Sequence, residues 1–81
     1  MRKKFPCPCC GFFTLEEEPP GTNEICPVCY WEDDLVQLED PTHWGANGVS
    51  LVEARQNFIR FGASEEKFTS KVRRPLPDEV P

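Results

Sequence analysis

Four cysteines in the pattern C-x2-C-x15-C-x2-C constrain the fold of this chain more than any other feature of its sequence. They belong to two short strings, CPCCG at residues 7–11 and CPVCY at residues 26–30. Two cysteines three positions apart on a tight turn can bind one ion from one side, and a proline after the first cysteine favours that turn. The spacing therefore predicts one metal site with four thiolate ligands: Cys7, Cys10, Cys26 and Cys29.

The chain has a fifth cysteine, Cys9. Because Gly11 follows Cys10, and glycine accommodates the positive φ that ends such a turn, Cys10 rather than Cys9 is expected to face the ion. Cys9 is then predicted to be a small buried hydrophobe, with a free thiol open to oxidation as the alternative.

Four thiolates around one ion leave no open coordination position, which excludes metal-dependent hydrolysis at this site. We expect one Zn²⁺ per chain, with iron as the alternative. The ion would supply stabilisation on the order of 10 kcal/mol. That contribution matters because core burial minus chain entropy comes out near zero in a chain of 81 residues. Nine prolines also argue against a helical bundle, a coiled coil or a doubly wound sheet.

Residues 5–34 are predicted to form a ribbon around the two cysteine pairs. Residues 12–15 have the composition of a short strand, and the prolines and glycine of residues 18–23 reverse the chain before Glu24 and Ile25. Residues 30–31 are a candidate third strand. Residues 35–49 follow as a loop with one helical turn, in which Leu38 and Trp44 are expected to contact the core.

A helix is predicted over residues 50–61. Ser50 and Glu53 have the spacing of a capping box, and Gly62 ends the helix. We expect its apolar face to cover the aromatic residues of the cysteine segment. That face consists of Leu51, Val52, Ala54, Phe58, Ile59 and Phe61. Arg55 lies within that face, so we expect it to pair with Asp33 or Asp34.

A second, short helix is predicted from Ser64 to about Arg74, where Pro75 ends it. The predicted fold is therefore α+β: a small zinc-ribbon-like β-hairpin module, covered by one amphipathic helix and a short second helix and stabilised by metal. Residues 1–74 would form a single zinc-binding domain, with a ribbon at 5–34, a loop at 35–49 and a helical part at 50–74. Residues 75–81 would form a proline-rich tail that is extended and frayed.

Charge is distributed unevenly along the chain. Between Phe5 and Ala54 there are ten acidic residues and no Lys or Arg, and the chain has a net charge of −5. Such a field repels phosphate backbones, so nucleic-acid binding is disfavoured, and a basic protein partner is one explanation of equal weight with the next. A solvated acidic surface that aids solubility is the alternative. No stretch has the length and composition of a membrane span or a secretory signal, so we expect a cytoplasmic protein. In the reducing cytoplasm, clustered cysteines bind metal more often than they form disulfides.

Catalytic groups are not evident. His43 is the single histidine and has no nucleophile or acid–base partner at a recognisable spacing, so we expect a loop histidine and a protein that is not an enzyme. The acidic run at residues 32–34 lacks the alternating ligand pattern of a calcium loop and is expected to be solvated, apart from the partner of Arg55.

Three strings, CPCCG, ICPVCYWEDD and NGVSLVEARQNF, resemble the bacterial cysteine-rich CPCC family of small zinc-binding proteins. The resemblance covers residues 7–61 and implies that the four cysteines, residues 31–34 and the helix at 50–58 are family features. It implies no activity. The cysteine turns are also similar to those of zinc ribbons and of rubredoxin, although Tyr30 stands where rubredoxin has glycine.

These observations predict a non-enzymatic, structural zinc-binding module that acts as a protein-interaction domain. Two alternatives remain open. One is rubredoxin-like electron transfer, with iron in the four-cysteine site. The other is a nucleic-acid-binding zinc ribbon that uses the basic residues near the two ends of the chain: Lys3, Lys4, Lys71, Arg73 and Arg74.

Overall fold

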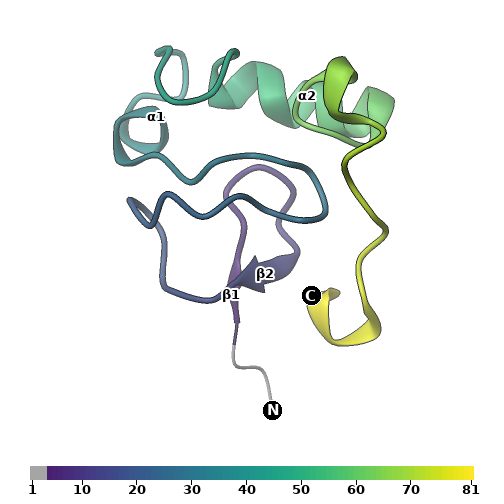
Figure 1. Ribbon diagram of the computed structural model, residues 1–81. Coiled ribbons are helices and arrows are strands. Elements are labelled where there is room, and N and C mark those ends of the chain that lie inside the picture. Colours follow the sequence, from purple (N-terminus) through teal and green to yellow (C-terminus); the bar gives the residue numbers. More distant parts are fainter. Residues whose placement is uncertain (1–3) are drawn as a thin grey trace.

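The computed structural model describes residues 4–81 and has the predicted α+β character (Figure 1). Its elements in chain order are β1 (Phe5–Pro6), β2 (Phe13–Leu15), α1 (Leu35–Glu39), α2 (Leu51–Phe61) and two 3₁₀ turns, η1 (Glu66–Phe68) and η2 (Pro77–Glu79). In Figure 1 the two α-helices lie on one side of the cysteine-bearing loops, and the C-terminal segment runs back along the molecule toward β2. A small hairpin covered by helices is thus the observed architecture.

The hairpin is formed by different partners from those expected. β1 pairs antiparallel with β2, with Phe5 opposite Leu15, so this hairpin encloses the first cysteine pair. The second pair is enclosed by an isolated antiparallel bridge between Ile25 and Glu32. The strand predicted at residues 12–15 is confirmed, but no strand forms at residues 30–31. Strand β1 was not predicted from the sequence, because Pro6 lacks the N–H that a strand interior requires.

Helix α2 has the predicted boundaries. The Ser50 side chain accepts a hydrogen bond from the Glu53 amide, the Glu53 side chain accepts from the Ser50 amide, and Gly62 ends the helix with a φ of 82°. Phe58 packs edge-on against Phe12, with 6.1 Å between the ring centroids. The predicted contact between this helix and the aromatic residues of the cysteine segment is therefore confirmed.

The apolar face of α2 is narrower than predicted. Leu51 and Ala54 are fully buried, but Ile59 is 84% exposed and Val52 is 39% exposed. Only one stripe of side chains packs against the core beneath the helix, and the side chains flanking it stay in solvent.

The segment between the ribbon and α2 contains the single helical turn that was predicted, α1. Asp34 caps it by accepting a hydrogen bond from the Val36 amide. Leu38 packs against the core as expected. The same expectation for Trp44 is wrong, since its side chain is 76% exposed.

The stretch after α2 forms the 3₁₀ turn η1 in place of the longer second helix predicted for residues 64–74. Its backbone donors are used elsewhere: the Ser64 amide donates to the Cys29 carbonyl at 2.7 Å, and the Arg73 amide donates to the Pro27 carbonyl at 3.1 Å. Both bonds hold the chain against the second cysteine pair, and the Arg73 bond uses a donor that an α-helix over residues 64–74 would need.

The end of the chain is not frayed, which corrects the expectation for the tail. Pro77–Glu79 form η2, and Glu79 is only 1% exposed. Its carboxylate accepts two hydrogen bonds from the Arg73 guanidinium, at 2.8 and 2.9 Å, and a third from the Leu76 amide. A bidentate Arg–carboxylate pair fixes the tail beside β2.

The core is centred on the cysteines. Its buried members are Cys7, Cys9, Leu15, Cys26, Val28, Cys29, Trp31, Leu51 and Ala54. Within the described part of the chain, no helix has the length and apolar character needed to cross a membrane.

Candidate metal centre

Two tight turns with the same backbone geometry carry the four cysteines; we call them knuckle 1 (residues 7–11) and knuckle 2 (residues 26–30). In knuckle 1 the Gly11 amide donates to the Cys7 carbonyl at 2.8 Å, and in knuckle 2 the Tyr30 amide donates to the Cys26 carbonyl at the same distance. The last residue of each turn has a positive φ, 80° at Gly11 and 71° at Tyr30. Tyr30 thus adopts the conformation that glycine adopts in knuckle 1.

The knuckles bring four sulfur atoms together. The Sγ atoms all lie within 4.8 Å of one another. The Cys7–Cys29 separation is 3.6 Å and the Cys10–Cys26 separation is 3.7 Å. A tetrahedron of sulfurs about 2.3 Å from a central ion has edges of about 3.8 Å, so the spacing fits a tetrahedral four-thiolate site. The cysteines that could hold a metal ion are those singled out by their spacing: Cys7, Cys10, Cys26 and Cys29.

The surroundings of the sulfurs are closed and include hydrogen-bond donors. Cys7, Cys26 and Cys29 are 2% exposed or less. Thr14 Oγ1 lies 3.0 Å from Cys26 Sγ, and the Val28 amide donates to the same sulfur at 3.4 Å. Such donors stabilise a thiolate and orient it toward an ion. The sequence analysis missed Thr14, whose only signal is its place on the strand beside knuckle 1.

The protonation states of the thiols depend on one another. The pKa of Cys26 is lowered, chiefly by its hydrogen bond with the Cys10 thiol, and burial acts against that shift. The pKa of Cys10 is raised, chiefly because it faces Cys26, and the pKa of Cys29 is raised, chiefly by Cys10. Four sulfurs at these distances, three of them buried, cannot all ionise unless a cation compensates their charge. The donor set therefore fits a divalent metal ion.

The fifth cysteine is placed as predicted. Cys9 is 8% exposed and belongs to the buried core, outside the four-sulfur cluster. It fills space as a small apolar side chain.

The predicted ion pair between Arg55 and the acidic run does not form. Arg55 donates from Nε to the Pro8 carbonyl at 3.0 Å and so joins α2 to knuckle 1 through a backbone contact. Asp33 is fully buried instead of solvated, and its carboxylate accepts from the Thr22 amide and hydroxyl. Asp34 is occupied as the cap of α1. Each acid accepts a hydrogen bond from a backbone amide, from Thr22 for Asp33 and from Val36 for Asp34, and a count of charges does not reveal such donors.

His43 lies in an exposed loop. Its Nδ1 is hydrogen-bonded to the Trp44 carbonyl, and its ring stacks on the Trp44 ring, with 5.5 Å between the centroids. The nearby Asp40 carboxylate accepts from Thr42, and these hydrogen bonds lower the pKa of Asp40. His43 and Asp40 are thus each engaged with their own loop.

Two amide side chains that the sequence analysis missed, one buried and one half-buried, organise the segment between the knuckles and α2. Gln37 is fully buried and donates to the His43 and Val49 carbonyls, while its oxygen accepts from Asn47. Asn47 also exchanges two hydrogen bonds with the backbone of Glu32, both at 2.8 Å. We call Gln37 and Asn47 the amide pair.

The fold and the sulfur cluster define a class of small protein in which two equivalent knuckles enclose a four-cysteine site of metal-binding type. Within that class, the family model Cysteine-rich CPCC matches residues 5–79. The chain therefore belongs to the cysteine-rich CPCC family. The match extends past residue 61, where the resemblance in the sequence strings ended, and so includes the segment that packs on knuckle 2. No curated protein matches the chain.

Proposed function

We propose that this chain is a non-enzymatic zinc-binding module that acts as a protein-interaction domain. The observation that carries the proposal is the cluster of four cysteine sulfurs within 4.8 Å of one another, at the centre of the core. When bound, Zn²⁺ would hold the two knuckles together with all four positions filled by protein, leaving none for water or substrate. A reducing cytoplasm suits this role because it keeps the four cluster thiols free for metal.

Zinc is favoured over iron by its preference for four thiolates in structural sites. The tyrosine of knuckle 2 does not decide between the two metals, since its φ of 71° reproduces the backbone that glycine gives. The test is the metal content and the visible spectrum of protein purified without added metal. One zinc per chain and no colour are expected. One iron per chain in a coloured protein would overturn the zinc assignment in favour of an electron carrier.

Two of the basic residues that a nucleic-acid role would need are paired with acids, which disfavours that role. Lys4 lies 3.6 Å from Glu16 and 3.9 Å from Glu79, and Arg73 is paired with Glu79. Lys3 lies outside the described residues. At low salt we expect no binding to duplex or single-stranded DNA or RNA. Binding that weakens steeply with salt would support the nucleic-acid alternative instead.

A protein partner is supported by large apolar side chains that the fold leaves in solvent. Trp44 is 76% exposed, and exposed tryptophans are frequent binding hot spots. Zinc-loaded protein should capture a partner from an extract of its source cells, and Trp44→Ala should weaken that capture while the zinc content stays unchanged. Val80→Ala is the matched control, because Val80 is also exposed and apolar. A Trp44→Ala variant that captures the partner as well as the wild type would remove Trp44 from the interface.

A further inference from the structure

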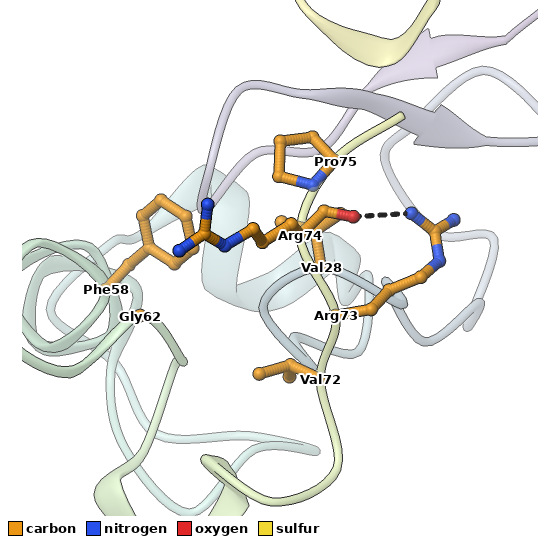
Figure 2. Close-up of a pocket in the computed structure, with 7 residues that line it drawn as sticks. All are labelled: Val28, Phe58, Gly62, Val72, Arg73, Arg74 and Pro75. Carbon is orange, nitrogen blue, oxygen red and sulfur yellow. Dashed lines mark hydrogen bonds between the residues drawn. The ribbon is translucent and has the colours of Figure 1, made fainter. Parts of the chain in front are cut away.

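A pocket of about 260 Å³ lies where knuckle 2, the end of α2 and the segment before the tail meet (Figure 2). Its apolar lining comes from Val28 of knuckle 2, Phe58 of α2, and Val72 and Pro75. Val28 stands between the two cysteines of knuckle 2, and its amide donates to Cys26 Sγ. The pocket is therefore built directly onto the candidate metal centre.

The walls of the pocket are fixed by backbone hydrogen bonds. The Arg73 amide donates to the Pro27 carbonyl, and the Ser64 amide donates to the Cys29 carbonyl. Gly62 ends α2 at the rim, with its amide bonded to the Phe58 carbonyl. A site pre-formed in this way loses little conformational entropy when a ligand binds.

The two arginines beside the pocket have different roles. Figure 2 shows their side chains extending in opposite directions, with that of Arg74 on the Phe58 side. Arg73 is held by the buried Glu79. Among residues 4–81, none of the ion pairs includes Arg74, so its guanidinium is available to a ligand at the pocket. The chain as a whole has a net charge of −5, but the charge beside this pocket is positive and unpaired among the described residues. The pocket therefore favours a ligand that carries a negative charge.

Size limits the ligand. Pockets for drug-sized ligands usually measure about 300–1,000 Å³, so this one suits a single large apolar side chain. An unpaired guanidinium is matched by a carboxylate, to which it can donate two hydrogen bonds. The C-terminal residue of a peptide carries an apolar side chain and a carboxylate on one Cα atom, whereas an internal acid would require two residues and a chain that leaves in both directions.

We propose that this pocket binds the free C-terminus of a protein whose last residue is large and apolar, with its carboxylate on Arg74. The proposal rests on the proposed function and names the chemistry of the partner. The surface is distinct from the acidic one for which a basic partner was predicted.

The test is a titration of the zinc-loaded full chain, followed by amide NMR shifts. The probe is an acetylated pentapeptide that ends in leucine with a free carboxylate. We expect shifts at Val28, Gly62 and Val72 and a dissociation constant on the order of 0.1–1 mM. The same peptide with a C-terminal amide, and one that ends in serine, should bind at least tenfold more weakly. Equal binding of the amide, or no shifts with any of the peptides, would overturn the proposal. So would equal binding of an amidated peptide that presents an internal Glu beside Leu.

Two variants separate the pocket from general attraction by charge. Arg74→Gln should weaken the leucine peptide at least tenfold, whereas Lys71→Gln removes a charge of the same segment outside the pocket and should leave binding unchanged. Equal losses in the two variants would overturn the assignment to Arg74.

Partner capture distinguishes this proposal from the proposed function. A partner retained by Arg74→Gln would overturn the pocket and leave the interaction role intact, whereas a wild type that captures nothing would count against the interaction role alone.

Discussion

Tyr30 occupies a backbone conformation that its counterpart Gly11 adopts without strain. A left-handed conformation costs a residue with a Cβ roughly 1–2 kcal/mol. The Tyr30 ring packs on Phe68, with 4.5 Å between the centroids, and ring pairs contribute about 0.5–1.5 kcal/mol beyond the area they bury. The contact therefore offsets much of the strain. It also joins knuckle 2 to η1, which a glycine at this position could not do.

Thr14 gives the first prediction, at the sulfur of Cys26. Thr14→Val removes the hydroxyl that lies 3.0 Å from this sulfur while keeping the shape of the side chain. Because loss of a hydrogen bond to a ligand atom typically costs about tenfold or more in metal affinity, we expect a loss of about tenfold, measured by competition with a zinc chelator.

Thr14→Ser is the matched control, since it keeps the hydroxyl and should stay close to the wild type. If Thr14→Val held zinc as tightly as Thr14→Ser, the hydroxyl would have no part in stabilising the thiolate.

At the scale of elements, the amide pair anchors the segment between the acidic run and α2, a role that was predicted for Trp44. Gln37 and Asn47 join α1, the acidic run and the loop before α2 through hydrogen bonds to backbone groups. Gly45 lets the loop backbone approach Gln37 and Asp34 closely, because a Cβ there would lie 2.7 Å from both side chains. A loop with little apolar content is thus fixed by polar contacts.

Asn47→Ala is therefore predicted to destabilise the fold. It removes the two hydrogen bonds to Glu32 and the side-chain donor to the buried Gln37 oxygen, which keeps only the Asn47 backbone amide as a donor. Since each of these three lost hydrogen bonds contributes about 1 kcal/mol, we expect the free energy of unfolding to fall by about 3 kcal/mol, measured by urea denaturation.

Gln56→Ala, on the exposed face of α2, should change the free energy of unfolding by less than about 0.5 kcal/mol. A loss in Asn47→Ala no larger than that of this control would contradict the role of the amide pair.

The tail gives a pH-dependent prediction. The Arg73 guanidinium holds the pKa of Glu79 well below its usual 4.5, at about 2. A depressed pKa in the folded state means that the contribution of Glu79 is complete above pH 4.5 and is lost as the pH falls toward 2. Wild type should be more stable than Glu79→Gln at pH 7, and the difference between them should shrink below about pH 4.5.

Urea unfolding at a series of pH values measures this difference, and loss of metal in acid affects both proteins alike. A difference that stayed constant from pH 7 to pH 3 would mean that the charge of Glu79 does not stabilise the tail.

At the scale of the whole molecule, the candidate metal centre and the hydrophobic core are the same place. Three of the four cluster cysteines are buried core residues, in contact with Trp31 and Leu51 in one cluster. Removing the ion would leave sulfurs at the centre of the fold that must take up protons or repel one another. Folding and metal binding are therefore expected to be coupled.

Chelation of the metal at neutral pH should accordingly unfold the chain. We expect a zinc chelator to abolish the helical circular dichroism of α2 and the dispersion of the amide NMR spectrum, and added zinc to restore both. Metal-free protein that kept a native spectrum would show that the core is stable by itself.

Local patterns in the sequence determined the knuckles, the four cysteines that meet, the capping box of α2 and its end at Gly62. Each depends on residues close together along the chain, where turn chemistry and helix capping act directly. The repeated C-P-x-C pattern also determined that the knuckles would share one geometry. The family resemblance rested on the same strings and was confirmed.

Only the tertiary structure decided which residues lie opposite one another across the chain. β1 pairs with β2, Arg55 meets the Pro8 carbonyl, Gln37 replaces Trp44 in the interior, and Glu79 returns to Arg73. These outcomes depend on which backbone donors and acceptors remain unsatisfied once the knuckles have closed, and the sequence does not display those groups. In so small a fold, polar contacts with the backbone position what a larger hydrophobic core would otherwise hold.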